Sequence, residues 1–212
     1  MTSLLPIFVR LENRPVVVVG AGTVALAKVE ALLRTGAAIT IIAPEAVAPL
    51  RVLAESGAIG WHRRPFGPAD LDGVFLVIAA TSHPAVNREI YRAAAERNLF
   101  CNAVDDPPNC DFYFGSVVAR GDLQIAISTA GQSPALSQRL RREIEEQLPA
   151  DLEPWLAEVG DLRREILSAA PPGANRNLLL HQLAERSLCD SPTCPTRLFA
   201  QPKRHSASDK PA

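Results

Sequence analysis

A glycine-rich run near the start of the chain has the composition of a loop that binds phosphate. It reads Gly20-Ala21-Gly22-Thr23-Val24-Ala25. In such a loop the first glycine permits a tight turn, the second lets the backbone approach a pyrophosphate, and a small sixth residue lets the following helix pack closely. The N–H groups at the start of that helix then hold the anion. A tight turn without a ligand is the alternative, but the position between a predicted strand and a predicted helix favours dinucleotide binding.

The residues after the second predicted strand bear on which dinucleotide binds. An acidic residue at the end of this strand usually binds the ribose of NAD. The expected position is apolar here, and Glu45 comes two or three residues later, so it either reaches the ribose or begins a helix. No arginine stands immediately there to receive the 2′-phosphate of NADP, although Arg51 is close in sequence. The pattern favours NAD.

Two adjacent carboxylates, Asp105 and Asp106, precede two prolines. A carboxylate beside a bound substrate can accept a proton and so act as a general base. The same residue types are typical of a turn, however. From the residues alone, the turn is the favoured interpretation.

The elements that would position these residues alternate between two kinds. Short β-branched runs, such as residues 15–19, are apolar throughout, as in strands that are buried on both faces. Longer runs have helical spacing. The alternation predicts parallel strands with right-handed crossovers, hence an α/β fold with a doubly wound sheet. The expected strands are 15–19, 38–42, 58–62, 74–79 and 99–104, and the expected helices are 23–35, 46–55 and 84–97.

The pattern changes after residue 111. Two β runs, 112–119 and 123–128, flank a short Gly- and Asp-containing gap and predict an antiparallel hairpin. Ser133 and Pro134 suit the cap and the first position of a helix. Further helices are expected over 152–168 and 175–188, and a disordered polar tail over 189–212.

Composition and charge narrow the class of protein. The net charge of -1 gives no reason to expect nucleic acid as a partner, and no apolar run approaches the roughly 18 residues of a membrane span. Four cysteines are too few for a disulfide scaffold, and no export signal is visible, so we expect a cytoplasmic protein. Cys189 and Cys194 lack zinc-site spacing, and no metal site is predicted.

Several motifs follow one another in a specific order over about the first 150 residues. They are Leu5-Pro6-Ile7-Phe8, Val19-Gly20-Ala21-Gly22, Ala79-Ala80-Thr81 followed by Val86-Asn87, Asn102-Ala103-Val104-Asp105-Asp106, and Ile127-Ser128-Thr129-Ala130-Gly131-Gln132-Ser133-Pro134-Ala135-Leu136. Together they resemble the precorrin-2 dehydrogenase family, which also forms the N-terminal module of siroheme synthase. Ala130 departs from the family, which commonly has glycine there.

The resemblance implies both architecture and reaction. It implies an NAD-binding Rossmann domain over residues 1–111, a small β dimerisation and substrate region over 112–148, and a helical region over 149–188. The implied reaction is NAD-dependent removal of two hydrogens from precorrin-2, which yields sirohydrochlorin on the route to siroheme. We expect a homodimer that forms at the hairpin around Gly121, because this hairpin has few core-forming partners within the chain.

The resemblance also implies roles for individual residues. Asp105 aligns with the family's catalytic aspartate, which makes the general base the better interpretation of this residue and leaves Asp106 to the turn. Thr81 ends the fourth strand, at the edge of the sheet where ligands bind. The implied cofactor contacts beside Gly20 and Gly22 are Thr23, Val24, Pro44 and Glu45.

The implied tetrapyrrole substrate is a polyanion and needs cations and donors. Arg120, Arg139 and the helix that starts after Ser133 are candidates. Alternatively, Arg139 and its neighbouring arginines form a solvated helix face that pairs with nearby glutamates. Ser128 either contacts the substrate or ends a strand.

The sequence is also compatible with two other functions. Some members of the family also insert iron into sirohydrochlorin, and such chelation can use the same carboxylate. A nucleotide-sensing module without catalysis would explain the glycine loop, but it would not explain the run that ends at Asp105.

Overall fold

The computed structural model describes residues 4–184 of the chain. The expected tail over 189–212, with Cys189 and Cys194, lies outside these residues. The chain divides into two compact units, of which the first is Met1–Phe114 and the second begins at Gly115. Each unit is built around its own sheet.

The first unit contains a parallel sheet of five strands in the order β3-β2-β1-β4-β5. Because β1 is central, Val19 at its end pairs with Ile42 on one side and with Ala79 on the other. The carboxyl ends of these three strands therefore meet at one edge of the sheet. The strands are β1 Pro15–Val19, β2 Ala38–Ile42, β3 Gly60–His62, β4 Leu76–Ala79 and β5 Phe100–Ala103.

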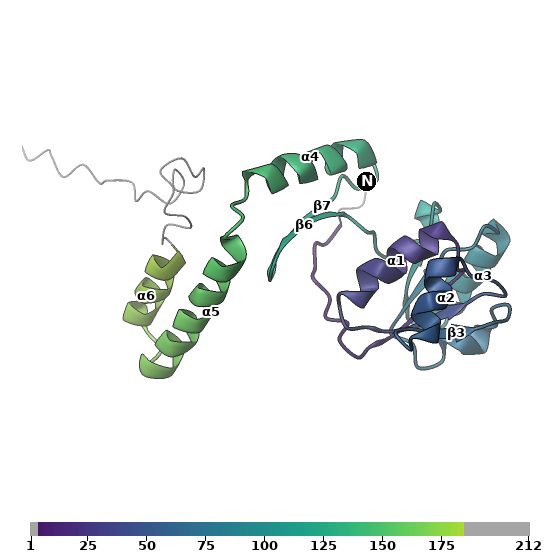
Figure 1. Cartoon of the computed structure of the whole chain (residues 1–212), viewed down its shortest axis with the longest axis horizontal. Helices are drawn as coiled ribbons and strands as arrows, with labels where there is room; N and C mark the ends of the chain where they lie inside the picture. Colours follow the sequence, from purple (N-terminus) through teal and green to yellow (C-terminus); the bar gives the residue numbers. More distant parts are fainter. Residues whose placement is uncertain (1–3, 185–212) are drawn as a thin grey trace, which may run out of the picture. The chain divides into compact units, whose positions relative to one another are not determined.

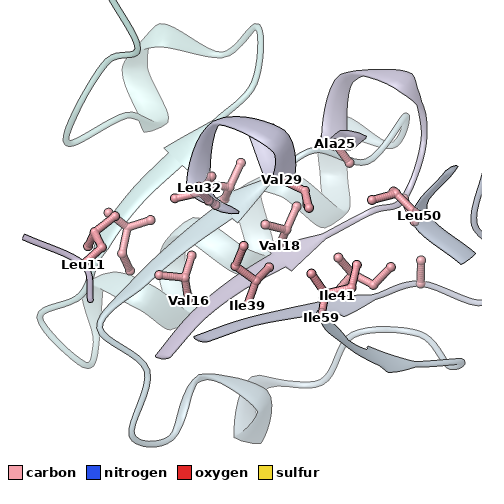
Figure 2. Packing of buried hydrophobic residues seen from close by; sticks show 14 residues of the cluster. Leu11, Val16, Val18, Ala25, Val29, Leu32, Ile39, Ile41, Leu50 and Ile59 are labelled. Carbon is pink, nitrogen blue, oxygen red and sulfur yellow. The ribbon is translucent and has the colours of Figure 1, made fainter. Parts of the chain in front are cut away.

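Both faces of this sheet are covered. On one face Ala25, Val29 and Leu32 of α1 pack toward Val16 and Val18 of β1, as Figure 2 shows. On the other face the buried side chains of α3 pack against the alternate residues of the same strands. The predicted doubly wound α/β fold is confirmed (Figure 1). The helices are α1 Thr23–Leu33, α2 Ala48–Glu55 and α3 Pro84–Ala95, with 3₁₀ turns η1 Pro68–Leu71 and η2 Pro107–Asn109.

The second unit pairs a small antiparallel sheet with helices. Strands β6 Ser116–Arg120 and β7 Leu123–Ile127 form the predicted hairpin, in which Arg120 pairs with Leu123. The Ser133 hydroxyl accepts a hydrogen bond from the Leu136 N–H at 3.2 Å, so it caps the following helix as expected. The helices are α4 Pro134–Gln147, α5 Leu152–Ala169 and α6 Ala174–Ala184.

One predicted strand is wrong over its first half. Residues 112–115 are irregular, and β6 begins only at Ser116. The Phe112 carbonyl accepts a hydrogen bond from the Asn102 side chain at 2.8 Å, and the Phe112 and Phe114 rings lie 5.5 Å apart. These residues therefore belong to the first unit rather than to the hairpin, although their types are typical of a strand.

Replacement of Ser133 by alanine should lower the free energy of unfolding of the second unit by about 1 kcal/mol, because an N–H at the start of α4 loses its acceptor. Urea unfolding followed by circular dichroism measures this change. Ser168→Ala is the matched control, since the Ser168 hydroxyl is exposed and donates only within α5. Equal stability of the Ser133→Ala variant and the parent would show that the cap contributes nothing.

Candidate functional site

The turn after β1 passes directly against the turn after β4. A Cβ atom added to Gly20 would lie 2.3 Å from the Ala80 carbonyl oxygen, and Gly20 has φ +104°. The Gly20 N–H donates to the Ile42 carbonyl at 2.9 Å, and the Ala80 N–H donates to the Val19 carbonyl at 2.8 Å. Both the close approach and the left-handed backbone require glycine at position 20.

Gly22 has a different environment. It is the N-cap residue of α1 and has an ordinary φ of -84°. No heavy atom of the described residues lies within 4 Å of a Cβ added there. The protein's own packing therefore does not require glycine at this position. An open backbone at the start of a helix fits the close approach of a pyrophosphate to the N–H groups of that helix.

A cavity of about 790 Å³ opens where β1, β2 and β4 end. Its volume lies within the range of about 300–1,000 Å³ that is usual for binding sites of small molecules and cofactors. Its lining includes all the predicted cofactor contacts and the predicted base: Gly20, Gly22, Thr23, Val24, Pro44, Glu45, Thr81 and Asp105. The residues therefore fit a bound dinucleotide.

The lining also includes residues that the sequence did not indicate as part of a site, among them Pro65, Phe66, Ser82 and His83. The first two follow β3, which lies beside β2 in the sheet, with His62 paired to Ile42. Sequence order alone did not indicate that this loop would reach the cavity. Ser82 and His83 directly follow Thr81. Their position after β4 could therefore have been used to predict them.

Thr81 is held by a buried asparagine. The Asn87 side-chain carbonyl accepts hydrogen bonds from the Thr81 hydroxyl at 2.7 Å and from the Thr81 N–H at 3.2 Å. The Asn87 side-chain amide donates to the Thr81 carbonyl at 3.1 Å. Asn87 is only 4% exposed. Asn87 thus shapes the turn after β4, while its neighbour Val86 lines the cavity.

Asp105 lies in a sharp turn after β5, with φ +60°. The turn is fixed on both sides, because the Val104 N–H donates to Ala79 at 2.9 Å and the Asp106 N–H donates to Ala103 at 3.2 Å. The Asp106 carboxylate accepts a hydrogen bond from the Asn109 side chain at 2.8 Å and so supports the turn. The exposed Asp105 side chain carries no such bond to the turn and lines the cavity.

A lysine that the sequence-based analysis missed lies near this carboxylate. Lys28 is half-buried on α1, and burial lowers the pKa of its ammonium group, an effect that the negative charge of Asp105 opposes. A signal was present in the sequence, because Lys28 lies three residues after Ala25 and four before Leu32, on the buried stripe of the helix.

The predicted substrate contacts belong to the second unit, and each has a local partner. The Arg120 guanidinium donates to the Glu145 carboxylate at 3.1 Å, and this bond, together with a second one from Arg141, holds the pKa of Glu145 below its usual value. Arg139 pairs with Glu143 at 3.2 Å on an exposed helix face. The Ser128 hydroxyl accepts a hydrogen bond from the Ala130 N–H at 3.1 Å.

Two further observations concern metal ions and membranes. They contain no cluster of three or more His, Cys, Asp or Glu side chains that could hold a metal ion. Among the helices within residues 4–184, none combines the length and the apolar character needed to cross a membrane.

Comparison with known families identifies the first unit. A family described as "Putative NAD(P)-binding" matches residues 7–116, which is more than half of the chain. The chain belongs to this NAD(P)-binding family. The prediction of a nicotinamide dinucleotide as the cofactor is therefore confirmed. A second family, described as "Sirohaem biosynthesis protein central", matches residues 120–147 of the same chain.

Two proteins with similar sequences are named siroheme synthases. The chain is 47% identical over 148 residues to Siroheme synthase 1 of Cronobacter sakazakii and 41% identical over 174 residues to Siroheme synthase of Zymomonas mobilis. These alignments cover 70% and 82% of this chain but only 31% and 37% of the relatives. The chain thus spans about a third of the length of these relatives.

A solved structure has a similar fold. The structure named "SirC, precorrin-2 dehydrogenase" matches with a TM-score of 0.75 and 25% identity, over 93% of this chain and 98% of that chain. The resemblance to the precorrin-2 dehydrogenase and siroheme synthase family is confirmed.

The two glycines should respond differently to alanine. Gly20→Ala should lower the free energy of unfolding by more than about 2 kcal/mol, because left-handed backbone strain adds to the clash with Ala80. Gly22→Ala should fold like the parent but bind NAD at least about tenfold more weakly, a loss of about 1.4 kcal/mol in binding free energy. Thermal unfolding and isothermal titration calorimetry measure the two effects. Parent-like NAD affinity in Gly22→Ala would contradict the placement of the pyrophosphate.

Proposed function

We propose that this protein is an NAD-dependent dehydrogenase that removes two hydrogens from precorrin-2 and yields sirohydrochlorin, a step toward siroheme. The observation that carries this proposal is the joint lining of one cavity by the dinucleotide-binding glycines and the Asp105 carboxylate. The tetrapyrrole substrate is supported by the names of the similar structure and of the relatives. The cytoplasm remains the predicted location.

The glycine loop and the strand ends are the proposed holders of the cofactor. The N–H groups at the start of α1 receive the pyrophosphate, and Gly22 leaves room for it. Glu45 lines the same cavity, and its negative charge favours NAD because it would repel the 2′-phosphate of NADP. When bound, the nicotinamide ring supplies the acceptor for a hydride.

Asp105 is the proposed general base. Removal of two hydrogens from a carbon framework releases one hydride and one proton, and the carboxylate accepts the proton. The turn around Asp105 is held by backbone hydrogen bonds to Ala79 and Ala103, so the backbone that carries this carboxylate is fixed. A left-handed backbone is uncommon for a residue other than glycine, and such strain is concentrated at functional sites.

The cationic contacts to the substrate are proposed in the second unit. Arg139 is 62% exposed in its pair with Glu143, and an exposed pair of this type contributes only about 0.3–0.5 kcal/mol. It can therefore exchange Glu143 for a carboxylate of the substrate at little cost. Arg120 is held more firmly by Glu145 and is the weaker candidate. Ser128 offers a hydroxyl that is exposed.

Asp105→Asn should abolish turnover while NAD binding is retained. Asparagine tolerates the left-handed backbone and keeps the side-chain shape, but it cannot accept the proton. We expect kcat to fall by about 100-fold or more, measured as NADH formation and the sirohydrochlorin spectrum with precorrin-2 and NAD. Asp106→Asn is the control, because Asp106 supports the turn. Parent-like turnover by Asp105→Asn would remove this residue from the mechanism.

The same assay separates two alternatives. The relatives are named siroheme synthase, and siroheme contains iron, so iron insertion is the second candidate function. Addition of ferrous ion to preformed sirohydrochlorin tests it by the spectrum of the product. NAD binding by the parent protein without any turnover would instead indicate a nucleotide sensor.

The hairpin β6–β7 supports a homodimer. A two-stranded sheet is at best marginally stable in water and needs a partner surface. One face of the hairpin carries Val117, Ala119 and Ala126, all exposed, and Val117 is 47% exposed. A second copy of the same hairpin would cover this apolar face.

Val117→Asp should shift the protein from dimer to monomer, because a charge would be buried in the proposed interface. Light scattering coupled to size-exclusion chromatography at micromolar concentration reports the mass. Val52→Asp is the matched control, since Val52 is 62% exposed on α2 of the first unit. A monomeric parent protein would refute the homodimer.

A further inference from the structure

The loop after β3 is closed by one carboxylate. Both oxygens of Asp70 accept hydrogen bonds from the Arg64 guanidinium, one of them at 2.8 Å, and the Gly67 N–H donates to the same carboxylate at 2.8 Å. The Asp70 side chain is only 8% exposed although it carries a charge. Such a two-pronged pair has a defined geometry as well as a favourable energy. Asp70 therefore fixes the path of the chain between Arg64 and itself.

The rest of this loop is held only at its ends. Its start is paired in the sheet at His62, and its end is buried at Leu71, which is 1% exposed. Between these anchors Pro65 and Ala69 are exposed. Burial thus contributes little to the position of the intervening stretch, and the contacts of Asp70 determine it.

Phe66 lies within this stretch and has two environments. It packs against the buried residues on the α3 face of the sheet, and it also lines the cavity. Pro44 and Pro65 line the same cavity. A flat aromatic base finds suitable partners in an aromatic ring and in apolar side chains of this kind.

The order of the strands indicates which part of the cofactor meets Phe66. An acidic residue after the second strand binds the ribose of the adenosine half of NAD, and Glu45 occupies that place in the cavity lining. Strand β3, which the Phe66 loop follows, lies beside β2 and farther from β4 and β5. Phe66 therefore belongs to the adenosine end of the cavity, and Asp105 to the opposite end.

We propose that Asp70 is a positioning residue for the cofactor, because its clamp on Arg64 and Gly67 holds Phe66 against the adenine ring of NAD. This inference rests on the proposed placement of the cofactor, with the adenosine ribose at Glu45. It does not depend on the identity of the second substrate or on the general base.

The first test measures NAD affinity by isothermal titration calorimetry. Phe66→Leu should weaken binding by about fivefold to tenfold, since leucine keeps an apolar contact with the core but offers no aromatic face. Asp70→Asn should weaken it by about fivefold, because the loop loses its clamp. Arg64→Met should give the same loss as Asp70→Asn, since it removes the other half of the pair. Parent-like affinity in Asp70→Asn and Arg64→Met would overturn the proposal.

The matched control is Asp72→Asn. The Asp72 carboxylate also pairs with an arginine, Arg97, at 3.0 Å, but it is 68% exposed and is not among the described lining residues. This variant should bind NAD like the parent. Circular dichroism shows that each variant is folded. If Asp70→Asn does not fold, Arg64→Met carries the test, because the Arg64 side chain is 49% exposed.

A double variant decides whether Asp70 acts through Phe66. Asp70→Asn combined with Phe66→Leu should bind NAD no more weakly than Phe66→Leu alone, because the clamp then holds no aromatic face in place. Losses that multiply would show that the two residues act independently and would overturn the proposal. A role of Asp70 in overall stability alone would not produce this dependence on Phe66.

Two fragments of the cofactor locate the effect. Asp70→Asn should weaken binding of ADP-ribose by the same factor as that of NAD and leave binding of nicotinamide mononucleotide unchanged. A loss for the mononucleotide, with ADP-ribose unaffected, would place the nicotinamide at Phe66 and overturn the proposal. None of these measurements needs turnover. If the expected losses are found but the parent converts no precorrin-2, the proposed function fails and the role of Asp70 stands.

Discussion

The site depends on one contact between two stretches of backbone. Gly20, which directly follows β1, passes so close to the Ala80 carbonyl that a single added carbon would lie 2.3 Å from that oxygen. This contact brings the turn that starts α1 against the turn that starts α3. The cavity lies at this contact. Its lining extends from the end of β2 to the turn that follows β5. Any side chain at position 20 would push these turns apart and change the shape of the cavity.

The charged groups of the cavity lining are acidic rather than basic. Two carboxylates and a histidine line it, and no lysine or arginine is among its described lining residues. The backbone around Asp105 is fixed by hydrogen bonds to Ala79 and Ala103, so the turn determines where this carboxylate leaves the chain.

Much of the first unit was predictable because its signals are local. A continuous apolar run that ends at glycine, followed by helical spacing, identifies β1, the glycine loop and α1 without knowledge of any distant residue. The start of β6 was predicted too early, because Phe112 and Phe114 have strand-like types but are held by partners far along the chain, among them Asn102. Lys28 was missed for the same reason, since its partners are about 80 residues away.

The sequence by itself determined the kinds of elements, their order and the residue types that a dinucleotide and a proton acceptor require. Those properties follow from side-chain periodicity and from the conformational freedom of glycine, which act over a few residues. The tertiary structure decided which strand ends are neighbours, that the loop after β3 reaches the cavity, and that Lys28 packs on the Phe114 ring. These outcomes depend on strand pairing and core packing between distant segments, which no local pattern encodes.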